Sequence, residues 1–257
     1  MIEEILKLHS KEIDKVKKCL KNIEKIEVRP SLFTGVVGAV DSGFYTVRLG
    51  RMVFMRIKVR GVMFSYKNGK VVDYKKIGKG FEDLTLYIEE EEESDKVSLE
   101  RIKREIDMIN KLKDKVDLLF FDGSFLKIKK KFGDVLRGID DFAVAIAKTS
   151  SSQLLTKRCN TYIGDQIALN YFLKEGESTE PIVVDGLNVA YAKFGNNLPI
   201  RIEGKSYDLS VIASLCGKKY GYPFILTEAD RVARIRKPDI LDVKRSIRKL
   251  KFIRRLR

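Results

Sequence analysis

The stretch that decides the fold begins Gly35-Val36-Val37-Gly38-Ala39-Val40-Asp41-Ser42-Gly43 and continues in segments rich in Val, Ile, Phe and Tyr up to Ile77. Glycine-containing turns separate these segments, which is the pattern of successive antiparallel strands. We expect strands over Gly35–Asp41, Gly43–Leu49, Met52–Tyr66 and Val71–Ile77. Lys67-Asn68-Gly69 adds the Asn-Gly signal of a tight hairpin. This part of the chain therefore predicts an antiparallel sheet.

Further along the chain, helices alternate with strands. Apolar residues at helical spacing predict a helix over Ser98–Lys113, and the apolar run from Val116 to Phe121 predicts a buried strand after it. The same patterns predict helices over Asp134–Lys148, Asp165–Lys174, Ser206–Lys219 and Glu228–Arg236, and strands over Ile182–Phe194 and Leu198–Glu203. Antiparallel strands followed by alternating elements indicate an α/β domain over residues 31–237, a mixed sheet flanked by helices.

Both ends of the chain carry amphipathic segments. Within residues 1–30, apolar positions from Ile2 to Ile26 predict a long helix, with His9 packed on its apolar stripe. Residues 238–257 form a basic tail in which Val243, Ile247 and Leu250 fall on one helical face. We expect this tail either to dock on a protein surface or to contact nucleic acid.

Composition restricts the location and the chemistry. The sequence is 44% hydrophobic but contains no run near the roughly 18 apolar residues of a membrane span, and its first residues lack the zones of a secretion signal. We therefore expect a cytoplasmic protein without membrane contact. Cys19, Cys159 and Cys216 are odd in number and far apart, which predicts buried free thiols. With His9 as the one histidine, metal chemistry has to use oxygen ligands.

Charge is concentrated at the C-terminal end. The net charge is +15, and residues 231–257 hold twelve Lys or Arg against two Asp. Such a basic block attracts polyanions by releasing their counterions, so nucleic acid is the first candidate partner. An abundance of Lys, Glu and Ile is also typical of adaptation to heat, so charge alone does not decide between the two explanations.

Two aspartates end apolar runs: Asp41 follows Val36-Val37-Gly38-Ala39-Val40, and Asp122 follows Leu118-Leu119-Phe120-Phe121. An ionised carboxylate at the end of a core strand needs a cation or hydrogen bonds to offset its desolvation. A bound metal ion provides one explanation. The alternative is that each Asp starts a turn with its own side chain, since Ser-Gly follows Asp41 and Gly-Ser follows Asp122.

Helical geometry selects two further acids. Glu105 lies roughly 80° from the centre of the apolar face of its helix, and Asp230 lies about 70° from the centre of its own. Both border a buried face and can lean toward Asp41 and Asp122. The alternative is ion pairing, of Glu105 with Arg101 or Lys111 and of Asp230 with Arg231 or Arg234.

Four oxygen ligands suit Mn²⁺ or Mg²⁺, as one ion or two, which can activate a water and neutralise charge on a phosphodiester. The candidate metal ligands and catalytic residues are therefore Asp41, Glu105, Asp122 and Asp230. Val183-Val184-Asp185-Gly186 also ends a strand in Asp-Gly and resembles the first strand of PIN-like ribonucleases. Its late position in the chain favours a hairpin turn, with PIN-like chemistry as the weaker alternative.

In their order along the chain, these segments resemble the NurA family of DNA-end-processing nucleases. The resemblance rests on Ala39 to Gly43, Arg101 to Glu105, Leu119 to Ser124, Gly221 to Phe224 and Glu228 to Arg234. Shorter matches lie between them, at Ala147 to Ser150, Tyr162 to Asp165, Tyr191 to Lys193 and Ile200 to Glu203.

The resemblance implies an RNase H-like core and a Mn²⁺-dependent 5′ to 3′ exonuclease with endonuclease activity on single strands. It also implies a homodimer that works with a hexameric HerA-type helicase in resecting DNA ends for recombinational repair. Asp41, Glu105, Asp122 and Asp230 fall on the family's metal-site positions.

The polar positions of the family around the site are matched by Lys148, Tyr191 and Arg201, where a cation can hold phosphate. This chain departs from the family pattern in reading Asp-Ser-Gly at residues 41–43 where Asp-Gly-Ser is common, and in having Asp230 where relatives can have His. The alternative function is a non-catalytic DNA-binding adaptor that keeps the fold and recruits a translocase.

Overall fold

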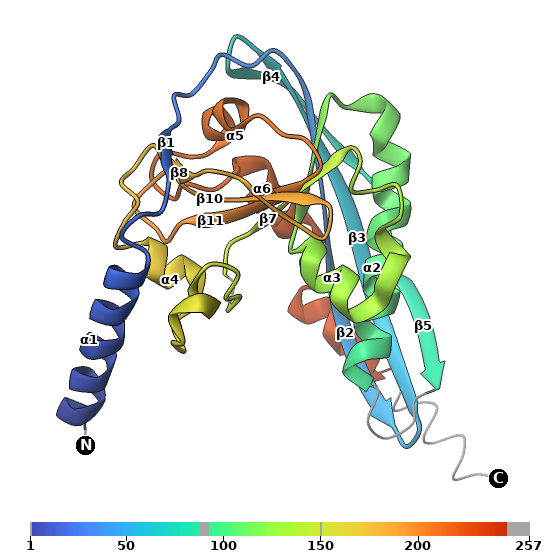
Figure 1. Ribbon diagram of the computed structural model, residues 1–257. Helices are drawn as coiled ribbons and strands as arrows, with labels where there is room; N and C mark the ends of the chain where they lie inside the picture. The colour runs from blue at the N-terminus through green and yellow to red at the C-terminus, as the bar shows by residue number, and fades with distance from the viewer. Residues whose placement is uncertain (1, 88–92, 150, 246–257) are drawn as a thin grey trace.

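A computed structural model describes residues 2–87, 93–149 and 151–245 (Figure 1). One sheet of eleven strands runs through this part of the chain, in the order β1-β8-β10-β11-β7-β6-β2-β3-β4, with β5 paired to β3 and β9 to β10. The strands are β1 (Lys25–Glu27), β2 (Gly35–Leu49), β3 (Met52–Lys67), β4 (Lys70–Ile77), β5 (Glu82–Tyr87), β6 (Leu118–Asp122), β7 (Ala143–Ala147), β8 (Glu177–Thr179), β9 (Ile182–Val184), β10 (Leu187–Lys193) and β11 (Ile200–Gly204). The helices are α1 (Ile2–Cys19), α2 (Glu93–Leu112), α3 (Phe125–Phe132), α4 (Asp165–Leu169), α5 (Leu209–Leu215) and α6 (Phe224–Ala233).

The centre of the sheet confirms the mixed α/β prediction. Strands β2, β3 and β4 are antiparallel, whereas β6 runs parallel to β2 and β7 runs parallel to β6. Three antiparallel strands extended by two parallel ones form the RNase H-like core that we expected. The Asn-Gly hairpin is also confirmed, because Asn68 and Gly69 adopt the positive φ angles that such a turn requires.

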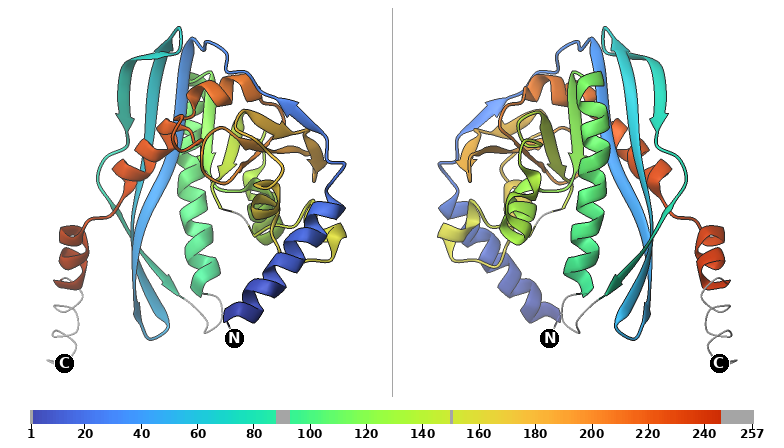
Figure 2. Two further views of the ribbon diagram at one scale, coloured as in Figure 1. Left: turned by 90° about the vertical axis from the view of Figure 1, so that its left-hand side faces the viewer. Right: turned by 90° about the vertical axis from the view of Figure 1, so that its right-hand side faces the viewer.

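Alternating side chains build a hydrophobic core on each face of this sheet. Leu119 and Phe121 pack with α2 and α3 on one face, while Phe120 packs with α5 and α6 on the other. Figure 2 shows α2 and α6 on opposite sides of the long strands β2 and β3. Because both faces are covered at the centre of the sheet, β6 is apolar up to Asp122 and β7 is apolar along its whole length.

Several boundaries differ from the sequence predictions, and in three places the difference changes the type or extent of an element. Strand β2 is continuous through Ser42 and Gly43, so Asp41 lies inside a strand and starts no turn. Residues 143–147, which we expected to be helical, form β7, because a fully buried central position outweighs the helical preference of its alanines. The N-terminal helix ends at Cys19 rather than near Ile26, and Lys25–Glu27 pair with β8 instead.

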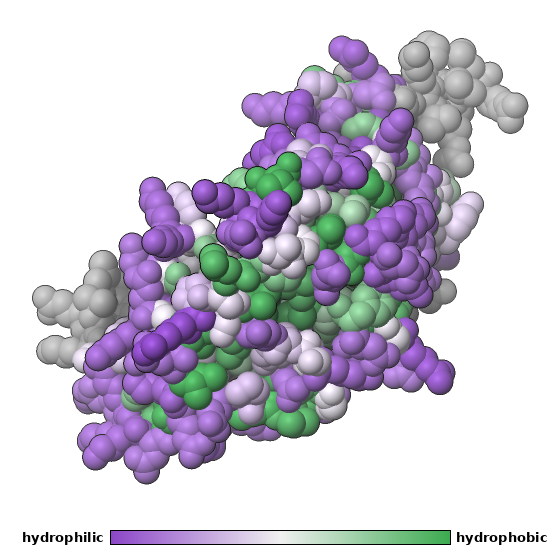
Figure 3. All heavy atoms as spheres, turned by 90° about the horizontal axis from the view of Figure 1, so that it is seen from above, coloured by the Kyte–Doolittle hydropathy of each residue, from purple (hydrophilic) through white to green (hydrophobic). Residues whose placement is uncertain are grey.

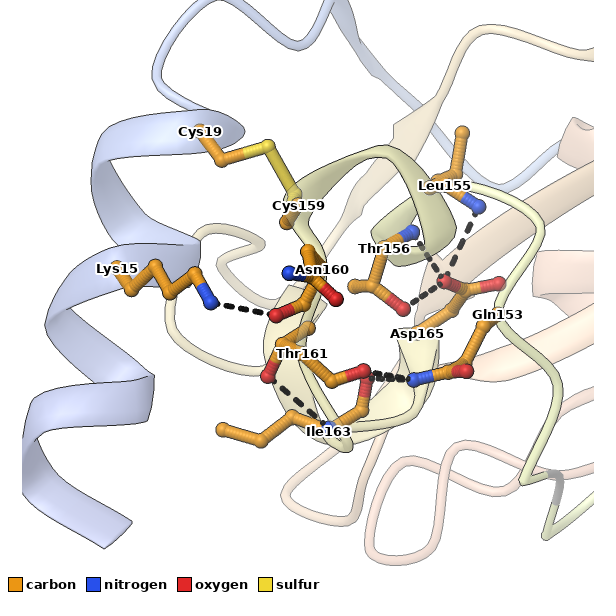
Figure 4. Close-up of a disulfide and its surroundings, with 10 residues drawn as sticks. All are labelled: Lys15, Cys19, Gln153, Leu155, Thr156, Cys159, Asn160, Thr161, Ile163 and Asp165. Atoms are coloured by element: carbon orange, nitrogen blue, oxygen red, sulfur yellow. Dashed lines mark hydrogen bonds between the residues drawn. A yellow bond between two sulfur atoms is a disulfide. The ribbon is translucent and has the colours of Figure 1, made fainter. Parts of the chain in front are cut away.

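The prediction of free thiols is wrong for two of the three cysteines. Cys19 at the end of α1 forms a disulfide with Cys159 (Figure 4). Cys159 is the last residue of the short 3-10 helix η3 (Thr156–Cys159). A sequence separation of 140 residues gives no spacing signal for this pairing. The bond holds α1 against the loop before α4, His9 bonds to Tyr162 of the same loop, and the first turns of α1 extend away from the body (Figure 1). Cys216 remains a free thiol.

The surface bears on the remaining predictions. No helix within the described ranges is long and apolar enough to cross a membrane. Seen from above, hydrophilic side chains surround a central area where hydrophobic ones gather (Figure 3).

The start of the basic tail is helical over residues 237–245, where Val243 is buried and Asp242 pairs with Arg56 at 2.7 Å. Ile247 and Leu250 lie outside the described residues.

Candidate functional site

Asp41 and Asp122 lie side by side on two neighbouring strands in the interior of the sheet. Parallel strands β2 and β6 pair Val40 with Phe121, so the next residue on each strand is an aspartate. Adjacent strands are about 4.8 Å apart, which brings the two carboxylates into electrostatic contact. Alternation from Phe120 directs Asp122 to the sheet face that α5 and α6 cover. Sequence order and strand register thus bring together two of the four predicted ligands.

Glu105 reaches Ser42, the neighbour of Asp41, from α2, which covers the other face of the sheet. It is 2% exposed, and its Oε1 accepts a hydrogen bond from the Ser42 hydroxyl next to Asp41. Arg101, one turn earlier on α2, lies 3.7 Å from the same oxygen. The other oxygen, Oε2, is buried and has no hydrogen-bond partner within the described part of the chain. The predicted ion pair with Arg101 is therefore present, but it leaves half of the carboxylate without a partner.

Asp230 is brought to the site by α6, and Gly43 makes this approach possible. A Cβ atom at Gly43 would lie 2.5 Å from the carbonyl oxygen of Ala233 near the end of α6. Only glycine lets the helix lie so close to β2, which gives the Asp-Ser-Gly order of residues 41–43 a structural reason. Asp230 itself is partly exposed and pairs with Arg234 at 2.7 Å, one of the two pairings considered above.

The four acids act on one another electrostatically. Burial, followed by the charge of Glu105 and smaller effects of Asp122 and Asp230, raises the pKa of Asp41 to about 7, although the backbone N–H of Ser42 opposes the shift. Burial also raises the pKa of Glu105, with Asp122 adding to the effect and Arg101 and Ser42 opposing it. Carboxylic acids whose pKa is raised by burial and by neighbouring negative charges are typical of a site that binds a cation.

The four carboxylates are of the chemical type that binds a hard divalent cation. Four carboxylates from two strands and two helices supply the oxygen ligands that Mn²⁺ and Mg²⁺ prefer, and the unpartnered Oε2 of Glu105 is an available ligand atom. As placed, however, no three His, Cys, Asp or Glu side chains in the described ranges converge on metal-binding geometry. Asp122 and Asp230 are instead engaged by Lys148 and Arg234.

Lys148 lies between the Asp122 carboxylate and the Tyr222 ring. The Lys148 ammonium donates to Asp122 Oδ2 at 3.1 Å and lies 4.2 Å from the centre of the Tyr222 ring. The Tyr222 hydroxyl is buried and makes no hydrogen bond of ordinary geometry in the described residues. Burial, then the charges of Asp122 and Asp41, raise the pKa of Tyr222. The sequence analysis did not select Tyr222, although it lies in the quoted segment Gly221 to Phe224.

Arg201 belongs to a buried ion pair that the sequence analysis missed. Its Nε lies 2.6 Å from Glu203 Oε1, and both side chains are almost fully buried on β11. Arg201 also donates to the hydroxyls of Ser124, at 2.7 Å, and of Ser152. Glu203 in turn accepts from Ser124 Oγ and from the backbone N–H of Leu126. The pair thus holds the turn directly after Asp122.

Tyr191 is placed differently from the other predicted polar residues. It is fully buried on β10, and its hydroxyl donates to Asp165 at 2.6 Å. Asp165, also fully buried, accepts further bonds from the backbone of Leu154 to Thr156 and from the Thr156 hydroxyl. Tyr191 therefore contacts the loop after β7 through Ser152, with 3.3 Å between the two hydroxyl oxygens.

A family model described as NurA domain matches residues 35–235. The chain belongs to the NurA family.

Solved NurA structures share the fold of this family member. The NurA nuclease from Sulfolobus solfataricus matches with a TM-score of 0.73 and 13% identity, over 97% of this chain and 94% of that one. A NurA structure with manganese matches with a TM-score of 0.66 and 12% identity, over 94% of this chain and 96% of that one. NurA bound to dAMP and manganese gives 0.62 and 12%, over 91% and 93%. No curated protein matches the sequence.

In this NurA-family chain Asp122, alone among the four acids, lines a cleft of about 1070 Å³. The rest of the lining comes mainly from α2, the helix α3, residues 148–149 and 151–154 after β7, and the turn at Asp185. Asp185 is exposed on the β9–β10 hairpin with a positive φ of 48°, as expected for a turn. It does not end a buried strand, as the PIN-like alternative would require. The structure therefore brings Lys148 and Arg201 to the cleft with Asp122, and leaves Tyr191 behind its wall.

Proposed function

We propose that this NurA-family protein is a metal-dependent DNA nuclease and that Asp41, Glu105, Asp122 and Asp230 hold its ion. The observation that carries the proposal is that the charges of Glu105, Asp122 and Asp230 all act on Asp41, whose pKa is raised to about 7, while one oxygen of Glu105 is unpartnered. Mn²⁺ is the preferred ion because related structures contain manganese, and Mg²⁺ uses the same ligand chemistry.

A bound ion of this kind would lower the pKa of a water and neutralise charge on the scissile phosphate. Lys148 now neutralises Asp122, and its ammonium is free to turn to a phosphate oxygen once Asp122 has another cation. The Tyr222 ring holds that ammonium in place from one side. Arg201, fixed by Glu203, keeps Ser124 and thereby the Asp122 turn in position.

The finer activity follows from the family resemblance. We infer 5′ to 3′ exonuclease and single-strand endonuclease activity in the cytoplasm, as a homodimer that resects double-strand-break ends with a HerA-type hexameric helicase. Supporting this choice of substrate, one related structure is bound to dAMP, a deoxynucleotide. The domain division into residues 1–30, 31–237 and 238–257 stays a proposal.

The test is cleavage of linear DNA labelled at its 5′ end, with Mn²⁺, Mg²⁺ or EDTA. Wild-type protein should degrade the DNA with Mn²⁺ and stop in EDTA, and Asp122→Asn should be inactive with every metal. Asp114→Asn removes the same charge from an exposed position on η1 (Lys113–Lys115) and should cleave like the wild type. Cleavage by Asp122→Asn at the wild-type rate would refute the proposal.

A non-catalytic DNA-binding adaptor is the second candidate. The observation in its favour is that Lys148 and Arg234 already neutralise two of the four acids, and the carboxylates do not converge as placed in the described structure. An adaptor would bind DNA without cleaving it at any metal concentration, and Asp122→Asn would leave its DNA affinity unchanged.

A further inference from the structure

We propose that the cleft beside Asp122 is a track for one nucleic-acid strand, and that Lys127 and Lys130 on α3 hold two of its phosphates. This inference rests on the proposed function only in taking DNA as the substrate and Asp122 as the point where the strand is cut. The track names the surface that carries the strand to that point.

The charge of the cleft is strongly one-sided. Its basic lining residues are Arg101, Lys127, Lys129, Lys130, Lys131, Lys148 and Arg201. Against them stand two acidic lining residues, Asp122 at one end and Asp185 on the turn at the far wall. A groove with this balance attracts a phosphate backbone along its length.

Ion pairing separates the lysines of α3 into two groups. Lys129 pairs with the buried Asp140, and Lys131 pairs with Asp95 at the start of α2, so both have structural partners. Lys127 and Lys130 are exposed and have no ion pair within the described ranges. Spaced by three residues, they lie on the same side of α3, one turn apart. They are the cations of the helix that remain available to a ligand.

The start of α3 is largely occupied by contacts within the protein. The backbone N–H of Leu126 donates to Glu203, that of Lys127 to the capping Ser124 hydroxyl and that of Ile128 to the Ser124 carbonyl. A phosphate near α3 is therefore held mainly by side chains. The aromatic residues of the lining, Phe121 and Phe132, are buried or half-buried and offer little surface for base stacking. Recognition should accordingly depend on the backbone and be independent of base sequence.

The walls of the cleft favour a single strand over a duplex. They come from α2, α3, the residues after β7 and the β9–β10 turn, so a ligand has to fit among four separate elements. Duplex DNA is stiff, with a persistence length of about 50 nm, and adapts poorly to such a cleft. A single strand bends freely and can lay successive phosphates against Lys127 and Lys130 before reaching Asp122.

The test is the salt dependence of binding to a labelled 20-residue oligo-dT, measured by fluorescence anisotropy in EDTA so that no cutting occurs. Losing two phosphate contacts should lower the slope of log K against log salt by about 1.4 for Lys127→Ala/Lys130→Ala, with about tenfold weaker binding at low salt. Lys127→Arg/Lys130→Arg should restore both. Lys113→Ala/Lys115→Ala removes the same charge beyond the far end of α2 and should match the wild type.

The outcomes separate this inference from the proposed function. Equal slopes for the α3 double variant and the wild type, or an equal loss in the Lys113/Lys115 control, would overturn the track. An equal loss on duplex DNA would overturn its restriction to a single strand, whereas an equal loss on oligo-U would support backbone recognition. Should the wild type bind through α3 but never cleave with Mn²⁺, the track stands and the nuclease proposal fails.

Discussion

Replacing Asp41 by Asn should stabilise the metal-free protein and weaken its response to Mn²⁺. The pKa of Asp41 is raised from its usual 3.8 to about 7, so the folded protein binds this proton more tightly than the unfolded chain does. The contribution of Asp41 to stability should therefore be most favourable below pH 4, fall as the pH rises to about 7, and stay reduced above it. Asn remains neutral throughout, and its side-chain oxygen can still accept the 2.7 Å bond from the Ser42 N–H.

The size of the effect follows from the shift in pKa. About three pKa units correspond to an upper limit of about 4 kcal/mol at pH 8. Relaxation of the site and partial access of water reduce this, so we expect Asp41→Asn to gain about 2 kcal/mol at pH 8 and close to nothing at pH 4. With Mn²⁺ the wild type should be the more stable of the two proteins. An ion present at 100 times its Kd stabilises the folded state by about 2.7 kcal/mol, and the variant has lost one of the carboxylates that bind the ion.

Urea unfolding of both proteins, at pH 4 and pH 8 and with EDTA or Mn²⁺, measures these differences. Asp114→Asn serves as the control, since this exposed residue carries no ion pair in the described structure and should change stability at neither pH. The reasoning is refuted if Asp41→Asn is destabilised equally at both pH values in EDTA, or if Mn²⁺ stabilises the variant as much as the wild type.

Three further substitutions test other parts of the account. Gly43→Ala forces α6 away from β2, and should cost about 1–3 kcal/mol in urea unfolding and weaken Mn²⁺ binding, whereas Gly217→Ala, with open space around it, should do neither. Cys19→Ser/Cys159→Ser opens a 140-residue loop and should cost about 5 kcal/mol, and the variant should no longer respond to reductant. Tyr222→Phe removes a buried hydroxyl without an ordinary hydrogen bond, so stability should change by less than about 1 kcal/mol while Mn²⁺-dependent cleavage falls; unchanged cleavage would remove Tyr222 from the site.

Local patterns were sufficient to predict the two strands and the helix that carry Asp41, Asp122 and Glu105. The apolar runs before Asp41 and Asp122 predicted two core strands, and their parallel pairing made the two acids neighbours. Helical periodicity placed Glu105 at the edge of a buried face, and the structure shows it 2% exposed beside Ser42. These predictions depended on residues close together in the sequence, where side-chain periodicity reports burial directly.

What the sequence analysis missed depends on contacts between distant residues. The alanine-rich strand β7 has local helix preference, and only its place between β6 and β11 makes it a strand. Glu203 gave no signal of burial, because Arg201 and Glu203 alternate with Ile200 and Ile202 as on a strand with one solvent-facing side. Its further partners, Ser124 and Leu126, are far away in the chain. The disulfide joins residues 140 positions apart, so spacing could not indicate it.

The most direct test of the metal site is anomalous diffraction from crystals of the protein soaked in Mn²⁺. We predict a manganese peak among Asp41, Glu105, Asp122 and Asp230, with Lys148 turned away from Asp122 and Arg234 away from Asp230, since both ion pairs now occupy ligand oxygens. A soaked crystal with no manganese among these four acids, and with both ion pairs intact, would contradict the account.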